Sequence, residues 1–276
     1  MKVIFHENFY KVYTSDPAAA AGRMEAIVEA IESQVELVGA QPATQKDIEA
    51  AHTKSHIDSV RRSGLYDIAA LAAGGAVQAA GIGLAEPAFG LIRPPGHHAS
   101  ADSAWGFCFF NNIAVALQAL KNKGQIKTAY VLDIDLHYGD GTVNILGSKG
   151  YVTVHNVEAT DRQTFLAEIE MEMDDCRVDL IGISAGFDNH RDDWGGLLLT
   201  EDYFKIGQLV KAAARLSGGG CFGILEGGYN HQVVGQNVMA LSVGLSDNDS
   251  FTEFFMAPLC VLHSLGFSSS GLWPAS

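Results

Sequence analysis

Apolar residues along the chain follow two patterns, short continuous runs and longer stretches with helical spacing. The short runs are bounded by Gly, Pro or charged residues and predict buried strands at 3–5, 89–92, 128–134, 150–154, 180–184 and 220–225. The helical spacing predicts helices at 22–38, 55–62, 67–81, 112–122, 164–176 and 200–216.

The alternation of these strands and helices predicts the fold class. It indicates βαβ units and one α/β domain, with a mainly parallel β-sheet flanked by helices on both faces. No linker or repeat divides the chain, so we expect one domain over 1–263 and a loosely attached tail, rich in Ser and Gly, over 264–276.

Composition and charge limit the kinds of molecule that the protein is expected to bind. A chain of 276 residues, 47% of them hydrophobic, is long enough to bury a large core, which excludes a disordered protein. With 32 acidic and 18 basic residues the net charge is −14, and no Lys/Arg cluster interrupts it, so we expect no nucleic-acid partner. The charge suits cationic partners such as lysine-rich peptides or polyamines, and the alternative is that it only serves solubility.

Location is predicted from cysteine usage and from the lack of a targeting segment. The four cysteines form no CxxC pair, which favours a reducing cytoplasm over a disulfide framework or a zinc finger. The start, M-K-V-I-F-H-E, becomes charged before a signal peptide could form. Residues 68–85 carry no charge but are mostly Ala and Gly, so a buried helix is favoured over a membrane span. We therefore expect a cytoplasmic protein with no membrane partner.

Four polar clusters follow predicted strands. They are R-P-P-G-H-H at 93–98, D-I-D-L-H at 133–137, S-A-G-F-D at 184–188 and E-G-G-Y-N at 226–230. Ligands of open α/β sheets bind outside the carboxyl ends of the strands. The clusters are therefore expected to face one crevice.

The D-x-D-x-H spacing suggests a metal site. Asp133, Asp135 and His137 alternate, so on an extended segment they project from one face, where burial is costly unless they are paired or bind a metal. An Asp and a His from this strand end, together with Asp188 from a neighbouring one, would give one nitrogen and two carboxylates with an open position for water, as catalytic zinc requires. The alternative is a capping or ion-paired carboxylate cluster.

Two further features suggest proton transfer or donation, and a third suggests the walls of a site. His97 and His98 follow Pro-Pro-Gly on a rigid turn, where either ring could take a proton from an activated water if a carboxylate orients it. Tyr229 follows two glycines, so its phenol could donate to an oxyanion, or could simply plug the sheet end. The aromatic residues at 107–110 would supply apolar walls.

Five motifs together resemble a known family. R-P-P-G-H-H-A, G-F-C-F-F-N-N, D-I-D-L-H-Y-G-D-G-T, S-A-G-F-D and E-G-G-Y-N occur over about 89–230 in the order and spacing of the histone deacetylase superfamily, which includes acetylpolyamine amidohydrolases and acetoin-utilisation proteins. The resemblance implies the arginase–deacetylase fold. It also implies a hydrolase that cleaves the amide C–N bond of an N-acetyl amine and releases acetate.

The resemblance also implies metal ions. Asp135, His137 and Asp188 correspond to zinc ligands, with iron(II) as the alternative occupant. A structural potassium ion is expected beside them, near Asp133, Asp135 and His137.

Catalytic roles follow from the same resemblance. His98 corresponds to the general base, and to the acid toward the leaving amine, with His97 as its electrostatic partner. Asp133 would orient His97, and Asp140 would orient His98. Tyr229 corresponds to the oxyanion donor.

Substrate contacts are expected at the rim of the site. Phe107 corresponds to one wall of the acyl-lysine tunnel, and Gly106, Trp194 and Gly228 are expected beside the substrate. Trp194 stands where polyamine-selective relatives are expected to carry an acidic residue, a role that Asp192 or Asp193 could fill. This departure weakens the case for a polyamine substrate.

The short segment after His155 is a departure from the family. Only 156–164 separates His155 from the next predicted helix, where the family has a long Gly-rich loop that supplies a second aromatic wall. We therefore expect a wider, shallower mouth, or a wall supplied by the second subunit of a homo-oligomer.

The leading hypothesis is a zinc-dependent amidohydrolase that acts on acetyl-lysine or on a small acetylated amine. An acetylpolyamine amidohydrolase differs from it only in substrate. An arginase-type ureohydrolase would need further carboxylates after Asp188, which Asn189, His190 and Arg191 do not supply in the expected pattern. A non-catalytic acyl-amine binding protein would be signalled by loss of a ligand, a His or the Tyr.

Overall fold

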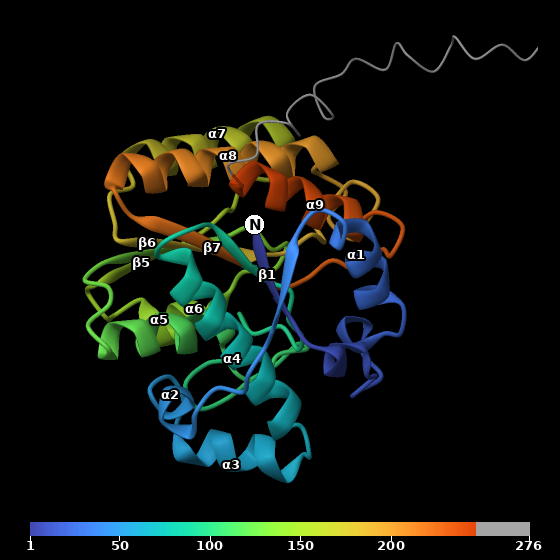
Figure 1. Cartoon of the computed structure of the whole chain (residues 1–276), viewed down its shortest axis with the longest axis vertical. Coiled ribbons are helices and arrows are strands. Elements are labelled where there is room, and N and C mark those ends of the chain that lie inside the picture. Colours follow the sequence, from blue (N-terminus) through green and yellow to red (C-terminus); the bar gives the residue numbers. More distant parts are fainter. Residues whose placement is uncertain (247–276) are drawn as a thin grey trace, which may run out of the picture. The chain divides into compact units, whose positions relative to one another are not determined.

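A parallel β-sheet forms the centre of the computed structural model, which describes residues 1–246 (Figure 1). Within that part of the chain the sheet has seven strands in the order β2-β1-β3-β7-β6-β4-β5, and every pairing is parallel. The strands are β1 (Lys2–Phe5), β2 (Glu36–Gly39), β3 (Ala88–Gly90), β4 (Ala129–Asp133), β5 (Val152–Asn156), β6 (Leu180–Ala185) and β7 (Gly220–Leu225). The predicted α/β fold with a mainly parallel sheet is confirmed.

Helices cover both faces of the sheet, as predicted (Figure 1). On one side lie α2 (Gln45–Glu49), α3 (Lys54–Arg62), α4 (Tyr66–Gly83), α5 (Asn112–Asn122) and α6 (Asp140–Leu146). On the other lie α1 (Arg23–Ile31), α7 (Arg162–Asp175), α8 (Thr200–Ser217) and α9 (Val234–Leu245). Two short 3-10 helices, η1 (Glu7–Tyr10) and η2 (Pro17–Ala19), follow β1.

Small residues let α4 approach its neighbours closely. A Cβ at Gly74 would lie 1.9 Å from the carbonyl oxygen of Gln41, and one at Gly83 would lie 2.9 Å from that of Cys221. The uncharged segment at 68–85 is therefore mostly a helix packed against the sheet. No helix within residues 1–246 combines the length and the hydropathy needed to cross a membrane.

The predicted helix at 22–38 is wrong in its last part. Helix α1 ends at Ile31, and Glu36–Gly39 instead forms the edge strand β2 beside β1. Leu37 is exposed on this edge, so the strand lacks the buried apolar run of the interior strands. Three helices, α2, α6 and α9, were not among those predicted from the sequence.

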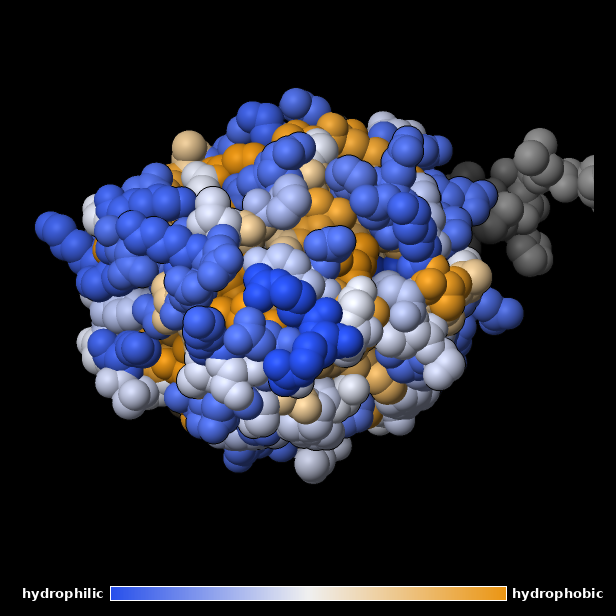
Figure 2. Space-filling model, turned by 90° about the horizontal axis from the view of Figure 1, so that it is seen from below, coloured by the Kyte–Doolittle hydropathy of each residue, from blue (hydrophilic) through white to orange (hydrophobic). Residues whose placement is uncertain are grey.

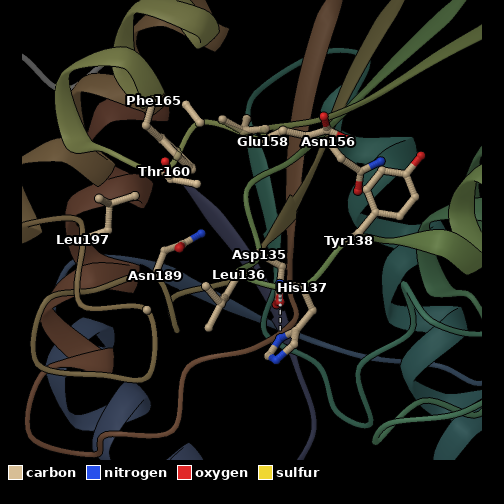
Figure 3. Close-up of a pocket in the computed structure, with 13 residues that line it drawn as sticks. Asp135, Leu136, His137, Tyr138, Asn156, Glu158, Thr160, Phe165, Asn189 and Leu197 are labelled. Carbon is tan, nitrogen blue, oxygen red and sulfur yellow. Dashed lines mark hydrogen bonds and ion pairs between the residues drawn. The ribbon is translucent and has the colours of Figure 1, made fainter.

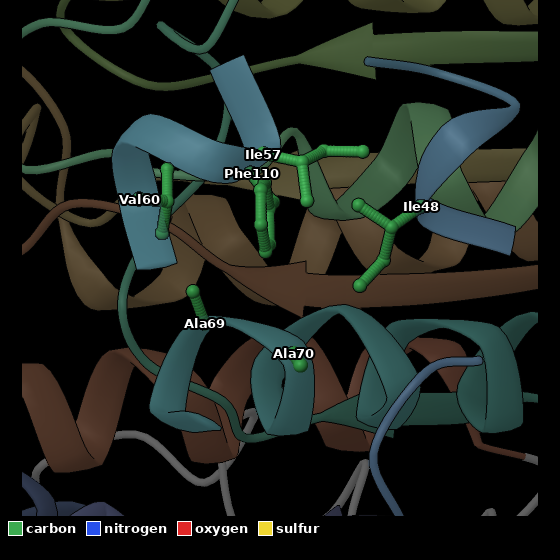
Figure 4. Packing of buried hydrophobic residues seen from close by; sticks show 6 residues of the cluster. All are labelled: Ile48, Ile57, Val60, Ala69, Ala70 and Phe110. Carbon is green, nitrogen blue, oxygen red and sulfur yellow. The ribbon is translucent and has the colours of Figure 1, made fainter. Parts of the chain in front are cut away.

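A small apolar cluster joins α2, α3 and α4 to the segment that follows the paired histidines (Figure 4). Its buried members are Ile48, Ile57, Val60, Ala69, Ala70 and Phe110. Phe110 belongs to the G-F-C-F-F-N-N motif, so the cluster anchors a motif segment to the three helices.

The predicted domain boundary at 263 and the predicted tail at 264–276 lie outside the described residues and stay predictions. Residues 1–246 form one compact unit. All five motifs fall within it.

Candidate active site

The four polar clusters meet at the carboxyl edge of the sheet. The segment 93–98 follows β3, Asp133 ends β4, Phe187 and Asp188 follow β6, and 226–230 follows β7. Strands β3, β7, β6 and β4 are consecutive neighbours in the sheet. Figure 2 shows the end of the molecule toward which β1 runs, where hydrophilic residues dominate and hydrophobic residues are visible in the hollows between them.

Asp135, His137 and Asp188 form a candidate metal site. Each offers one ligand atom, and the three atoms lie within 4.8 Å of one another. His137 Nδ1 is 3.1 Å from Asp135 Oδ1 and 3.2 Å from Asp188 Oδ2. The two carboxylates, Asp135 first and then Asp188, raise the pKa of His137 to about 10.

The backbone after β4 is folded rather than extended, which corrects the expected alternation of three side chains on one face. The strand ends at Asp133, whose Oδ1 accepts the N–H of Asp135 at 3.1 Å. Asp135 Oδ1 in turn accepts the N–H of His137 at 2.9 Å. Aspartates commonly form such local turns with the backbone two residues on. Asp133 is thereby turned toward His97, while Asp135 and His137 face Asp188.

The cluster fits a divalent cation. Its donor set is one imidazole and two carboxylates, a combination that zinc accepts. Asp188 Oδ2 is buried, and it shares its neighbour His137 Nδ1 with Asp135 Oδ1, so one N–H cannot satisfy both carboxylate oxygens. A Cβ at Gly227 would lie 2.6 Å from Asp135 Oδ2 and from Asp188 Oδ2, so glycine there leaves the carboxylates the space they occupy.

His97 and His98 each bind a carboxylate through Nδ1. His97 Nδ1 lies 3.1 Å from Asp133 Oδ2, and His98 Nδ1 lies 2.8 Å from Asp140 Oδ1. The two rings lie side by side with centroids 4.0 Å apart. Binding through Nδ1 leaves both Nε2 atoms for the site, and His97 Nε2 is 3.7 Å from Asp135 Oδ1.

The two histidines have opposite pKa shifts. Burial opposes charge on His97, but the carboxylates of Asp135 and Asp133 outweigh it and raise its pKa well above the usual value. Burial and the neighbouring His97 lower the pKa of His98 to about 4. Near neutral pH, His98 is therefore the ring able to accept a proton.

Tyr229 is positioned by the backbone on both sides of it. Gly228 has φ +110°, and its carbonyl accepts the Nε–H of Arg23 at 2.8 Å. Asp193 Oδ2 accepts the N–H groups of Tyr229 and Asn230, each at 2.7 Å. Burial raises the pKa of the phenol, so its proton is retained for donation.

Glu226, the first residue of the E-G-G-Y-N motif, lies beneath the paired histidines. Its Oε2 accepts the N–H of Gly96 at 2.6 Å, and Oε1 is buried without a hydrogen bond in the described chain. Burial raises the pKa of this carboxyl to about 7. The sequence placed Glu226 in a motif but assigned it no role.

Phe107 and Trp194 stand beside Tyr229. The Phe107 ring centroid is 5.7 Å from that of Tyr229 and 6.5 Å from that of Trp194, while the Trp194 and Tyr229 rings stack at 4.2 Å. Gly106 has φ +60° and leads the backbone past His98.

Trp194, carried by the loop after β6, is an aromatic neighbour of Phe107 from the same chain. The loop after β5 is short, as the sequence indicated: 157–161 connects β5 to α7. The absence of the second aromatic wall that the family's longer loop supplies, and a replacement of it by a second subunit, stay predictions. The width of the mouth stays a prediction.

A cavity of about 370 Å³, here called the side pocket, lies beside the metal cluster (Figure 3). Asp135, Leu136 and His137 line one part, and Asn156 at the end of β5 together with 157–160 of the short loop that follows lines another. In the view of Figure 3, the His137 ring lies at the opposite edge of the pocket from Glu158 and Asn156. The side pocket therefore lies next to the short loop after β5.

Trp105 is a site neighbour that the sequence did not indicate. Its indole N–H donates to Asp140 Oδ2 at 2.8 Å, and its ring lies 3.8 Å from that of His98. The position of an aromatic residue directly before the G-F-C motif does not indicate which ring it will contact. The contact of Trp105 with His98 and Asp140 is seen only in the folded chain, where the three segments that carry these residues meet.

Comparisons with known proteins identify the family. The histone deacetylase domain model matches residues 18–166. A protein described as a probable deacetylase from Methanothermobacter thermautotrophicus is 29% identical over 315 residues, covering 93% of this chain and 94% of that protein. A histone deacetylase-like amidohydrolase from Pseudomonas aeruginosa is 28% identical over 286 residues, covering 79% of this chain and 75% of that one.

A solved structure, the HDA15 HD domain, shares the fold. It has a TM-score of 0.74 at 23% identity and covers 87% of each chain. The chain belongs to the histone deacetylase family, and that membership supports a deacetylase, and hence a hydrolase, activity.

Proposed function

We propose that the protein is a zinc-dependent deacetylase that hydrolyses an N-acetyl amine, either acetyl-lysine or a small acetylated amine. The observation that carries this proposal is the convergence of the Asp135–His137–Asp188 cluster with two histidine–aspartate pairs and one phenol. Family membership supports the reaction class, while the residue roles and the metal are the proposal.

The metal cluster would hold zinc, with iron(II) as the alternative. When bound, zinc supplies Lewis acidity, polarising the amide carbonyl and lowering the pKa of a water to about 7. Potassium beside Asp133, Asp135 and His137 stays a prediction from the resemblance.

The chain's own residues carry out the proton transfers. His98 Nε2 accepts a proton from the attacking water while Asp140 accepts the Nδ1–H. The water oxygen bonds to the carbonyl carbon, and Tyr229 donates its O–H to the oxyanion that develops. His98 then returns the proton to the amine nitrogen as the C–N bond breaks, releasing acetate and the free amine.

His97 has a supporting role in this scheme. Its raised pKa keeps the ring positively charged, and it lies 4.0 Å from His98, between the metal cluster and the buried Asp133. A fixed positive charge at this place stabilises negative charge that develops on the substrate.

The substrate is best described as an N-acetyl amine whose amine part lies beside the neighbouring rings of Phe107, Trp194 and Tyr229. The side pocket of about 370 Å³ is lined by Asp135 and His137 but by none of these rings, so no part of the substrate is assigned to it. Specific action on acetylated polyamines is the second candidate, favoured only by the net charge of −14. Phe107, Gly106, Trp194 and Gly228 are the proposed substrate contacts.

Metal analysis combined with acetate release tests the proposal. The purified protein should contain about one zinc or iron per chain and release acetate from an acetyl-lysine peptide, acetylputrescine or acetylspermidine. Asp188→Asn should lose metal and turnover together. Glu170→Gln removes one carboxylate charge from an exposed surface pair with Lys205 and serves as the matched control. A protein with neither metal nor acetate release would refute the proposal.

The cytoplasmic location, the absence of nucleic-acid and membrane partners, and assembly as a homo-oligomer stay predictions. Each rests on the sequence features given above.

A further inference from the structure

The two histidine–aspartate pairs differ in how their carboxylates are held. The Asp133 side chain is 1% exposed, and its Oδ1 accepts the backbone N–H of Asp135. The Asp140 side chain is 44% exposed at the first residue of α6. When a carboxylate faces solvent, water competes for its hydrogen bonds. Its partner therefore holds it less firmly, and the carboxylate rotates more freely. The pair that contains the proposed general base is thus the less enclosed one.

Trp105 compensates for this exposure. Asp140 Oδ1 binds His98 Nδ1 at 2.8 Å, and Asp140 Oδ2 accepts the indole N–H of Trp105 at 2.8 Å. With both oxygens bound to side chains, rotation of the carboxylate about its last bond would break both hydrogen bonds. The indole also covers one face of the His98 ring, at 3.8 Å between centroids and 32° between planes. One side chain therefore contacts both members of the pair.

Core packing does not explain the conformation of Trp105, because the residue is 54% exposed. The backbone directs it instead. Gly106 follows with φ +60°, and a Cβ there would lie 3.0 Å from Cδ2 of His98. The Trp105 carbonyl accepts the N–H of Cys108 at 3.2 Å. The start of the motif segment thus forms a turn against His98 and presents the indole to it.

We propose that Trp105 is a positioning residue for the general base, acting through Asp140. It holds the Asp140 carboxylate so that His98 Nδ1 stays bound and His98 Nε2 points to the reacting water. This inference rests on the proposed function. It assigns Trp105 no contact with the reacting atoms.

A double-mutant cycle tests the action through Asp140. Trp105→Phe keeps an aromatic ring beside His98 but loses the N–H donor. In metal sites, loss of a hydrogen-bond partner that orients a functional side chain typically lowers activity about 10–100-fold. We therefore expect kcat to fall about tenfold, with KM changed less than about twofold. In an Asp140→Ala background the same substitution should cause no further fall, because the acceptor is already gone.

Two kinetic results would overturn the inference. One is an unchanged kcat in Trp105→Phe, and the other is the same fold loss in both backgrounds. Thermal unfolding of each variant accompanies the kinetics. If Trp105→Phe is markedly unstable, Trp105→His, which retains an aromatic N–H donor, should recover part of the lost kcat.

Indole NMR provides a readout that needs no turnover. The chain has three tryptophans, and Trp105→Phe identifies the Trp105 signal. Asp140→Ala should move this indole N–H resonance upfield and speed its exchange with solvent, while Glu170→Gln should leave it unchanged. An indole N–H resonance that is unchanged by Asp140→Ala would overturn the inference. A metal-loaded protein that releases no acetate, yet shows the NMR coupling, would refute the proposed function alone.

Discussion

Among the proposed catalytic groups, the phenol hydroxyl of Tyr229 is the one whose removal should disturb the structure least. Its ring stacks on Trp194, and its backbone is held through Asp193, so Tyr229→Phe keeps both contacts. We expect kcat to fall by about 10²–10³, as for loss of an oxyanion donor, while the metal content and KM stay close to wild type. Turnover of an acetyl-lysine peptide beside metal analysis measures this. A variant that retains near-normal kcat would show that another group donates to the oxyanion.

Gly227 gives a second prediction for a single residue. A Cβ there would lie 2.6 Å from one carboxylate oxygen each of Asp135 and Asp188, so Gly227→Ala must displace them. We expect metal affinity to fall about tenfold or more. Gly81→Ala is the matched control, because a Cβ there meets nothing within 4 Å. Competition titration with a zinc chelator compares the two, and equal affinities would contradict the proposed ligands.

The helical region α2–α3 is bonded to the motif segments through His52, which lies between those helices. His52 Nε2 accepts the N–H of Asn111, so Nδ1 carries the proton and donates to the Ser100 carbonyl at 2.9 Å. Burial lowers the pKa of His52 to about 4. Protonation would remove the acceptor for Asn111.

This pKa shift predicts a pH dependence of stability. The unfolded chain binds a proton at His52 below pH about 6.5, but the folded chain does so only below about 4. The stabilisation from neutral His52 is therefore complete above pH 6.5 and declines as the pH falls to 4. The difference in unfolding free energy between wild type and His52→Gln should shrink over that window. Urea denaturation at several pH values checks this, and a constant difference would count against it.

The apolar cluster at Phe110 gives a further prediction about these elements (Figure 4). Phe110 is 1% exposed and packs against His52 and Tyr66. Phe110→Ala should cost about 3–5 kcal/mol of unfolding free energy, because it leaves a cavity between the helices. Met171→Ala, at an exposed residue of α7, serves as the control. A cost near that of the control would mean that the cluster collapses around the gap.

Elements whose ends carry a clear local signal could be predicted closely from the sequence, and others could not. Strand β7 and helix α5 agree with the predicted bounds, because flanking glycine, charge or an asparagine cap marks their ends. Strand β2 lies at the sheet edge and depends on pairing with β1, which no local pattern encodes. The motifs likewise placed Asp135 and His98 in the site, whereas Trp105 is defined only by its contacts across segments.

For the whole molecule, charge should influence which substrates arrive rather than how they react. The net charge of −14 attracts cationic amines over a distance that salt shortens. We expect kcat/KM for acetylspermidine to fall as ionic strength rises from about 0.01 to 0.15 M, where the screening length drops from about 30 to 8 Å. A neutral acetylated amine should show little change. Equal salt dependence for both substrates would exclude steering by the protein's field.

The carboxylate of Asp193 connects the proposed substrate rim to the proposed oxyanion site. It accepts the backbone N–H of Trp194 through Oδ1 and the backbone N–H of Tyr229 through Oδ2. A bulky amine that displaces the backbone at Trp194 would therefore also displace the backbone at Tyr229. Such a compound could bind well and still be processed slowly. Discrimination among acylated amines would then be expressed in how fast they are turned over more than in how tightly they are held.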